Sequence, residues 1–310
     1  MVVSRSGINI TMNKQKLQQQ IDEWVVRYRS QEMDGKVASY IPQLKKANPN
    51  HLGIVLIGNN GLTLRSGDVN IPFTIQSISK VFSLIVACMQ RGIEQVLNYV
   101  NVEPTGEDFD SIMHLEMNRP KKPFNPFMNA GAITVTSLLT GETADEKLIP
   151  LIHLLEKMLG YRPTVNQEVY ESERDSLVRN RTIGHYLLEV EFLDSDVKVT
   201  LETYFKQCSI EITVDDLAKM GQILAHDGID PYSQKEIIPM SIARMAKALM
   251  VTCIMPQEIL LHMLDFQLKA VCREGLLLLY LRVFKMKRSH FCKDVGLVFM
   301  VQPSIKKGIA

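Results

Sequence analysis

The sequence predicts an α+β domain, because strand-like segments come first and helix-like segments dominate afterwards. Residues 52–68 contain an apolar run followed by an alternating run, which is typical of a hairpin. From residue 77 onward, most segments repeat apolar residues at helical spacing. The 310 residues contain no internal repeat and no low-complexity linker. We therefore expect one layered domain rather than an array of βαβ units.

The N-terminal part of the chain predicts one helix and one hairpin. Residues 14–31 form an amphipathic pattern that includes Trp24, the single tryptophan. The hairpin would occupy residues 52–68, with the turn Gly58-Asn59-Asn60-Gly61 between its two strands. Both elements precede the helix-rich part of the chain.

Three helices in the second half are predicted from their ends. Residues 143–160 begin with a Thr-x-x-Glu capping box and end at a glycine. A helix that begins at Thr213 carries two aspartates in its first turn, where the helix dipole favours acids. Residues 239–253 predict a further helix.

Composition excludes several classes of protein. The net charge of +1 creates no overall field toward nucleic acid or an anionic membrane. The five cysteines are an odd number, lie far apart in sequence and lack zinc-site spacing, which suits a reducing compartment. The chain has no signal-peptide layout and no apolar run approaching the ~18 residues of a membrane span. We expect a cytoplasmic protein without a metal, nucleic-acid or membrane partner.

A serine stands three residues before a lysine at the start of the helix predicted for residues 77–92. Ser77 and Lys80 would share one face, with Ser77 near the free N–H groups at the positive end of the helix dipole. The pair reads either as a nucleophile beside its base or as an N-cap beside a solvated lysine. Spacing alone does not decide between them. The same spacing recurs at Ser195/Lys198 and Ser304/Lys307.

Two stretches rich in proline and asparagine, 102–110 and 119–139, differ from ordinary connections. Within the second, Asn125 precedes a proline and Asn129 leads directly into a helix-like segment. Asparagines in such places commonly make turns and caps. The functional alternative is that Asn129 points its amide into a pocket opposite Ser77.

Seven segments together match a known family. They are VASYIPQL at 37–44, FTIQSISK at 73–80, VEPTGEDF at 102–109, KPFNPFMNAGA at 122–132, SERDSLVRNR at 172–181, YFKQCS at 204–209 and LAHDG at 224–228. In this collinear combination, over about residues 20–253, the chain resembles the serine-dependent glutaminases. The resemblance implies a β-lactamase/transpeptidase-like fold, an α/β sandwich with a helical part. It also implies hydrolysis of L-glutamine to L-glutamate and ammonia, no metal or organic cofactor, and a homo-oligomer, either dimer or tetramer.

The resemblance also assigns roles to individual residues. Ser77 matches the nucleophile, which would form a γ-glutamyl ester, and Lys80 matches its general base. A lysine desolvated near apolar side chains can be neutral enough to take the serine proton. The remaining matches are Tyr40, the active-site tyrosine near the serine, and the substrate-binding residues Asn129, Glu173, Asn180 and Tyr204. Glu173 would pair with the α-ammonium of glutamine, and the asparagines and Tyr204 would donate to its α-carboxylate.

Two other functions remain open from the sequence. Another Ser-x-x-Lys acyl hydrolase, such as a β-lactamase, is disfavoured because no Ser-Asp-Asn or Lys-Thr-Gly triplet is present. An inactive glutaminase-like protein that still binds glutamine is the second alternative. The C-terminal segment is the reason to consider it.

Residues 254–310 depart from the family pattern. The family continues with Gly-Met-Tyr-Asn and later Lys-Ser-Gly-Val, whereas this chain has Pro256 where the tyrosine is expected and Glu274 near the valine. The segment has nine Lys/Arg against four Asp/Glu. It is either a genuine module for a partner or a membrane surface, or a tail read in the wrong frame. A break inside a motif, without a linker, favours the wrong frame.

This departure predicts how the chain is divided. Residues 1–253 would be a single glutaminase domain that is incomplete at its C-terminal end, and 254–310 an atypical tail. The strands that this segment supplies in the family would be lost or altered, together with the second tyrosine of the active site. Family membership and turnover by this chain are therefore separate expectations.

Overall fold

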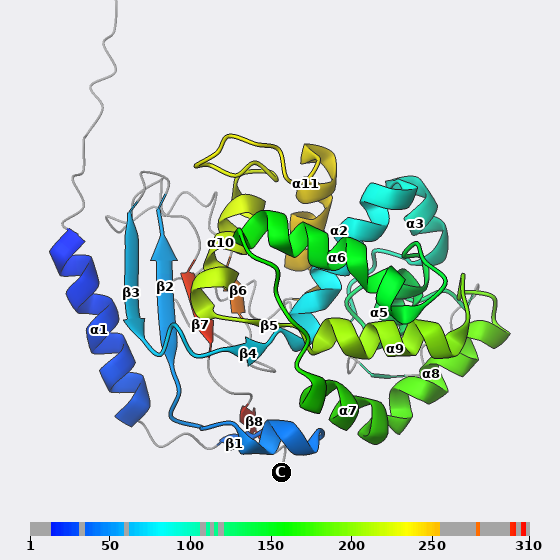
Figure 1. Ribbon diagram of the computed structural model, residues 1–310, viewed down its shortest axis with the longest axis horizontal. Coiled ribbons are helices and arrows are strands. Elements are labelled where there is room, and N and C mark those ends of the chain that lie inside the picture. Colours follow the sequence, from blue (N-terminus) through cyan, green and yellow to red (C-terminus); the bar gives the residue numbers. More distant parts are fainter. Residues whose placement is uncertain are drawn as a thin grey trace, which may run out of the picture.

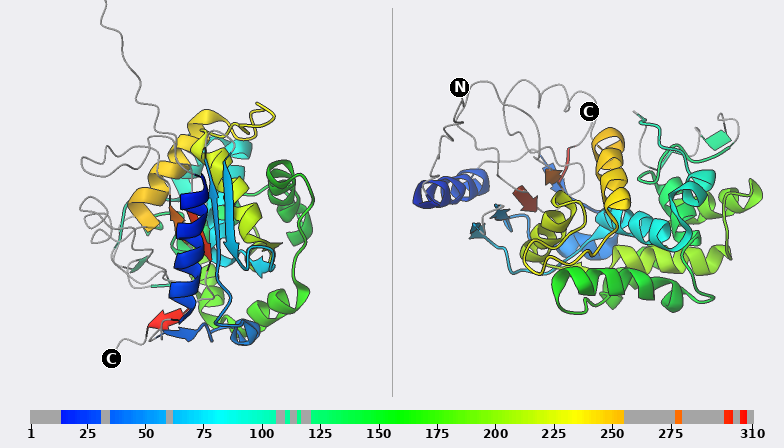
Figure 2. Two further views of the ribbon diagram at one scale, coloured as in Figure 1. Left: turned by 90° about the vertical axis from the view of Figure 1, so that its left-hand side faces the viewer. Right: turned by 90° about the horizontal axis from the view of Figure 1, so that it is seen from above.

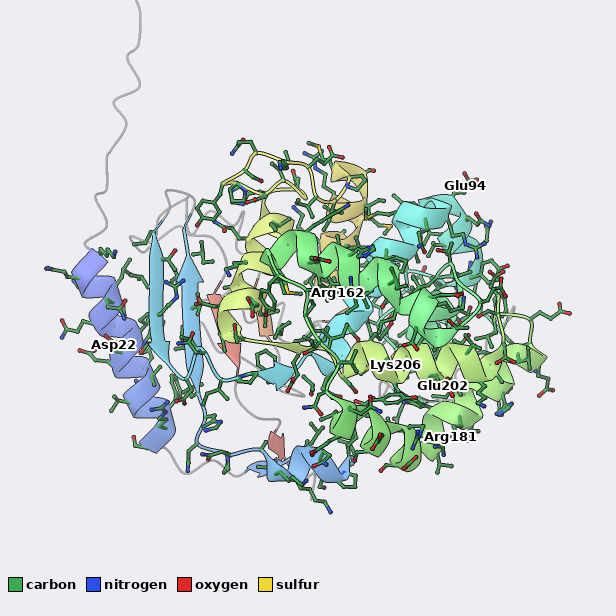
Figure 3. All side chains as sticks on the ribbon, in the orientation of Figure 1. Asp22, Glu94, Arg162, Arg181, Glu202 and Lys206 are labelled. Atoms are coloured by element: carbon green, nitrogen blue, oxygen red, sulfur yellow. The ribbon has the colours of Figure 1, made fainter. Side chains whose placement is uncertain are left out.

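The computed structural model describes residues 14–30, 35–58, 62–105, 110–111, 115–116 and 121–254, together with three short strands nearer the C-terminus. Figure 1 shows a sheet at one side of the molecule and a group of helices at the other. Asp22 on the sheet side and Glu94 on the helical side are labelled in Figure 3 and lie far apart.

The main sheet has four antiparallel strands in the order β3-β2-β7-β6. Its strands are β2 (Gly53–Ile57), β3 (Thr63–Gly67), β6 (Leu277–Leu279) and β7 (Val298–Val301). Val55 in β2 lies opposite Arg65 in β3 and opposite Phe299 in β7. The predicted hairpin is confirmed, while residues 59–61 of its turn lie outside the described residues.

Two further strand pairs connect distant parts of the chain. Strand β4 (Phe73–Thr74) pairs with β5 (Glu211–Ile212), and β1 (Gly35–Val37) pairs with β8 (Ile305–Lys307). The β4–β5 pair holds the segment just before Ser77 against the segment that follows helix α9.

Helices cover both faces of the main sheet. Helix α1 (Lys14–Ser30) packs Leu17 and Ile21 against Leu56, and helix α10 (Val214–Ala225) contacts β2 in the main core. Figure 2 shows the strands between these two helices. Because both faces are covered, all five residues of β2 are buried.

Helix α2 (Ser79–Arg91) runs through the centre of the helical part. Ten of its 13 residues are buried, so the helix is enclosed on nearly all sides rather than along the single stripe that its apolar spacing predicts. The reason is that four helices pack around it. They are α3 (Ile93–Tyr99), α5 (Asn129–Ser137), α6 (Ala144–Leu159) and α11 (Met240–Leu249).

The other helices complete the wall around α5. Helices α8 (Val178–Glu189) and α9 (Val197–Cys208) pack against α5, and α7 (Gln167–Ser176) packs against α9. A 3₁₀ helix, η1 (Pro42–Lys46), lies against α7.

The predicted helix ends are confirmed at the capping positions. Thr143 and Thr213 each form a capping box, with Glu146 and Asp216 as the reciprocal partners. Gly160 ends α6 with φ of 83°, a left-handed conformation that glycine adopts without steric cost. The predicted helix at 239–253 is α11 followed by a π-helical turn, Met250–Ile254.

The C-terminal segment supplies strands, but short ones. Strand β7 pairs with β2 and β6 pairs with β7, so the sheet continues beyond the hairpin. The sequence predicted that the strands supplied by the C-terminal segment would be lost or altered. The described strands indicate that they are altered rather than lost. The predicted division of the chain at residue 253 remains a prediction, because most of 254–310 lies outside the described residues.

Candidate active site

Ser77 lies on a short 3₁₀ turn, η2 (Gln76–Ile78), directly before α2. The helix predicted to start near Ser77 therefore starts at Ser79, and the turn provides the approach to it. Ile78 N donates to Ile75 O at 2.9 Å, whereas the N–H of Ser77 has no backbone acceptor among the described residues. The Ser77 side chain is exposed. A serine hydroxyl and an available N–H thus lie together at the surface.

The residue before Ser77 has an unusual backbone conformation. Gln76 has φ of 46°, in the left-handed region that non-glycine residues rarely adopt. Its side-chain amide donates to Thr74 Oγ1 at 3.0 Å. Such conformations cluster at functional sites, where the surrounding structure holds them.

Lys80 is buried one turn beyond Ser77, with 3% of its surface exposed. Its Nζ donates to Phe127 O at 3.0 Å and to Asn129 Oδ1 at 2.7 Å. The solvated-lysine reading is therefore wrong for Lys80. No hydrogen bond of the described residues joins it to Ser77 Oγ. Catalytic hydrogen bonds are often loose in ligand-free proteins.

Asn129 is the centre of a buried hydrogen-bond cluster. Its Oδ1 also accepts from Tyr204 OH at 3.3 Å, and its Nδ2 donates to Asn180 Oδ1 at 3.0 Å. The three side chains of Asn129, Asn180 and Tyr204 come from α5, α8 and α9 and are 6%, 4% and 3% exposed. The functional reading of Asn129 fits this placement better than the capping reading, because its amide bonds other side chains.

A different asparagine makes the turn before α5. Asn125 Oδ1 accepts from the N–H groups of Phe127 and Met128, at 3.0 and 3.1 Å. Gly131 allows this turn to approach the helix, since a Cβ there would lie 2.0 Å from Asn125 O. The turn fixes the residue at which α5 starts, and thereby the direction in which the Asn129 side chain points.

The helix faces explain why Tyr204 is buried while Glu202 and Lys206 are only partly buried. Glu202 and Lys206, labelled in Figure 3, lie on the outer side of α9. Tyr204 is two residues from each and therefore points to the other side, toward α5. Its ring also packs edge-on to Phe205, with ring centroids 6.0 Å apart.

Glu173 is a buried carboxyl on α7, 1% exposed, whose Oε1 has no hydrogen-bond partner among the described residues. Burial raises its pKa from 4.5 to about 8, and a hydrogen bond from the Gln76 side chain opposes the rise. No ion pair of the described part of the chain includes it. An unpaired buried carboxyl is costly and indicates a group kept for a ligand.

Cys208 is a member of the site that the sequence did not single out. Its Sγ lies 3.7 Å from Ser79 Oγ, and its electrostatic neighbours include Glu173, Lys80 and Tyr204. Burial holds the pKa of its thiol well above the usual range, so the thiol is neutral. Its position four residues after Tyr204 on the same helix was the available signal.

Tyr40 is half-buried, directly before η1. That 3₁₀ helix is attached to α7, because Gln43 N donates to Ser172 Oγ at 3.4 Å and Gln43 Nε2 donates to Glu168 Oε2 at 2.9 Å. Tyr40 is thereby carried to the helix that bears Glu173.

The second Ser-x-x-Lys pair has a structural explanation. Ser195 Oγ lies 2.8 Å from Thr200 Oγ1, just before α9, where Asp196 caps the helix. Ser304, in the third pair, lies outside the described residues. Among the described pairs, Ser77/Lys80 is the one beside a buried polar cluster.

Two further findings concern the described residues. No described helix has the length and apolar character needed to cross a membrane. In the same part of the chain, no three His, Cys, Asp or Glu side chains gather as metal ligands do.

Comparison with known proteins identifies close relatives. The profile of the family named Glutaminase matches residues 35–258. The Glutaminase of Oceanobacillus iheyensis is 58% identical over 253 residues, which cover 82% of this chain and 76% of the relative. Glutaminase 1 of Bacillus subtilis is 50% identical over 234 residues, covering 76% of this chain and 72% of the relative.

Solved structures agree with these sequence relatives. The structure of a probable glutaminase from Bacillus subtilis has a TM-score of 0.81 at 39% identity, covering 94% of this chain and 91% of the other. The covalent complex of a Bacillus subtilis glutaminase with 5-oxo-L-norleucine, formed by reaction with 6-diazo-5-oxo-L-norleucine, has a TM-score of 0.79 at 38% identity. It covers 94% of this chain and 92% of that one.

Proposed function

The chain belongs to the glutaminase family, and from that premise we propose that it hydrolyses L-glutamine with Ser77 as nucleophile and Lys80 as general base. The Ser77 hydroxyl attacks the side-chain amide carbon while Lys80 Nζ takes its proton. Lys80 Nζ passes this proton to the leaving nitrogen, so that ammonia departs and a γ-glutamyl ester remains on Ser77. Water then cleaves the ester and releases L-glutamate.

The arrangement around Lys80 supports this role. A carbonyl oxygen and the oxygen of Asn129 hold Nζ in place, and both are neutral acceptors. The N–H of Ser77 supplies a donor for the oxyanion of the tetrahedral intermediate.

Substrate recognition uses the buried polar side chains. Glu173 binds the α-ammonium, and Asn180 and Tyr204 bind the α-carboxylate together with Asn129. In the ligand-free site, Asn129 Nδ2 donates to Asn180 Oδ1 and Tyr204 OH donates to Asn129 Oδ1. Binding of the carboxylate exchanges these bonds for bonds to the ligand. Tyr40, carried on the segment attached to α7, completes the site beside Ser77.

The observation that carries the proposal is the buried Lys80, fixed to Asn129 one turn after an exposed serine. A hydrolysis screen with glutamine, asparagine and a chromogenic β-lactam tests it. We expect ammonia release from glutamine and no β-lactam turnover. Turnover of the β-lactam without glutamine would overturn the proposal. Glutamine binding without ammonia release would instead indicate a glutamine-binding remnant.

The C-terminal segment bears on whether the present chain reaches full activity. We propose that residues 254–310 are read out of frame, with 1–253 as the incomplete glutaminase domain. The alignment with the Oceanobacillus relative covers 82% of this chain, and the match to the family profile ends at residue 258. The loss of the family's Gly-Met-Tyr-Asn motif removes the second tyrosine of the site.

We predict that the coding DNA just after codon 253 contains a one- or two-base shift. Reading on in another frame then encodes Gly-Met-Tyr-Asn and, further downstream, Lys-Ser-Gly-Val. Correcting that base raises the rate of glutamine hydrolysis, because it restores the missing tyrosine. If neither alternative frame encodes these motifs, the segment is genuine and the wrong-frame proposal fails.

The location and assembly complete the proposal. Cys88, Cys208 and Cys253 are free thiols, which suits the reducing cytoplasm. A homo-oligomer, dimer or tetramer, follows from the family resemblance, and light scattering of the purified chain measures it.

A further inference from the structure

Glu173 has an unusual environment for a group that is to bind a cation. It is 1% exposed, and its Oε1 has no hydrogen-bond partner in the described part of the chain. An ionised carboxylate buried in this way loses hydration, and among the described residues the Gln76 hydrogen bond compensates only part of that loss. A neutral carboxylic acid loses far less, so the empty site favours the protonated form.

The groups around Glu173 give little support to a negative charge. From α9 it faces Cys208, whose thiol is neutral because burial raises its pKa. From η2 it faces the uncharged amide of Gln76. From α2, Lys80 lies near Cys208, and its Nζ donates to Phe127 O and Asn129 Oδ1.

Three charged side chains on or near α7 have ion-pair partners of their own. Arg174 pairs with its neighbour Asp175 at 2.9 Å, on the exposed side of the helix. Lys46 of η1 lies 3.9 Å from Glu168, one and a half turns before Glu173 on α7. Lys206 of α9 pairs with Asp145 at 2.5 Å. No described ion pair reaches the buried carboxyl.

We propose that Glu173 is a specificity-determining residue that exchanges its own proton for the α-ammonium of the ligand. This inference rests on the proposed function, because the ligand is the free amino acid. In the empty site the carboxyl is a neutral acid. When R–NH₃⁺ enters, the O–H bond of Glu173 breaks, the proton goes to solvent, and the carboxylate pairs with the ammonium. No covalent bond of the ligand changes in this step.

The exchange selects ligands that bring their own cation. An amide without the α-amino group, such as 4-carbamoylbutanoate, leaves the acid protonated and gains no ion pair. It also leaves the carboxyl Oε1 without a partner. The site discriminates between ligands because only one with an α-ammonium provides the partner that the buried Glu173 carboxyl lacks. Such a site rejects the wrong ligand more strongly than an apolar pocket does.

The number of protons released when glutamine binds to the full chain tests the proposed proton exchange at Glu173. Calorimetry of glutamine binding in buffers of different ionisation enthalpy measures the protons released. From the pKa of about 8, we expect release of about 0.9 proton per bound glutamine at pH 7, and an apparent Kd that falls about tenfold from pH 6 to 7. 4-Carbamoylbutanoate should release none.

Two variants separate the exchange from general effects on the fold. Glu173→Gln keeps the shape and neutrality of the acid, so any residual glutamine binding should lose the proton release and the pH dependence. Glu171→Gln on the same helix removes an exposed carboxylate and should behave as the original chain. Glutamine binding by the original chain with no proton release and a constant Kd between pH 6 and 7 overturns the proposal.

A second measurement decides the state of the acid even without ligand. At pH 7 the infrared difference between the original chain and Glu173→Gln should contain the C=O stretch of a protonated carboxyl. Absence of that band overturns the proposal, whatever the binding result. A chain that shows the band but binds no glutamine supports the neutral acid and counts against the proposed function.

Discussion

Replacing Ser77 with alanine abolishes glutamine hydrolysis, with an expected loss in kcat of on the order of 10⁴-fold or more. The reason is chemical, because without the hydroxyl no γ-glutamyl ester can form. The stability of the protein should change little, since Ser77 is exposed and has no side-chain hydrogen bond among the described residues. Ammonia release measures kcat, and thermal unfolding measures stability.

A covalent probe makes the same test independent of turnover. A relative of this chain forms a covalent complex by reaction with 6-diazo-5-oxo-L-norleucine. Mass spectrometry of this chain after the same treatment should find the adduct on the peptide that contains Ser77. The Ser77→Ala variant should remain unlabelled, while Ser195→Ala should be labelled as the original chain is. Full turnover by Ser77→Ala would show that the nucleophile has been assigned wrongly.

The fold was predictable where local rules and burial agree. The capping boxes at Thr143 and Thr213 and the hairpin of β2 and β3 follow from short-range patterns, and the structure confirms them. Helix α2 was predicted as one-sided because a lone sequence cannot say how many helices will surround it. Its buried serines, Ser79 and Ser83, are polar and masked the full burial.

The site was only partly predictable, because most of its contacts join residues far apart in sequence. Lys80, Asn129, Asn180 and Tyr204 come from four helices, and the family motifs identified them before any contact was known. Cys208 and the strained Gln76 were missed. For Cys208 the signal was its position four residues after Tyr204 on α9, whereas the left-handed backbone of Gln76 leaves no mark in the sequence.

Burial also explains why charge alone was a poor guide to function. The sequence left a solvated and a desolvated lysine both open at position 80 and assigned no role to Lys147, yet each of the two is only 3% exposed. Lys147 Nζ donates to Ser137 O at 3.0 Å and also to Leu139 O, at the C-terminal end of α5. It stabilises the end of that helix opposite Asn129 and so has a structural role.

Replacing Lys80 with arginine should reduce kcat for glutamine by about 10³-fold or more, because a guanidinium does not give up its proton and cannot serve as a base. Arginine can still donate to the oxygens of Phe127 and Asn129, so much of the polar network can persist. Ammonia release at saturating glutamine measures the loss. Glutamine should still bind, since Lys80 has no assigned contact with the ligand, and calorimetry checks this.

Lys147→Arg is the matched control for this substitution. It places the larger guanidinium at an equally buried lysine that also donates to main-chain oxygens. Both variants should lose some stability through overpacking, by about 1–3 kcal/mol. Turnover should collapse in Lys80→Arg alone. If the two variants lose activity in proportion to their loss of stability, Lys80 is a structural lysine. A Lys80→Arg protein that keeps near-normal kcat would exclude Lys80 as the base, and the proton of Ser77 would have to leave by another group.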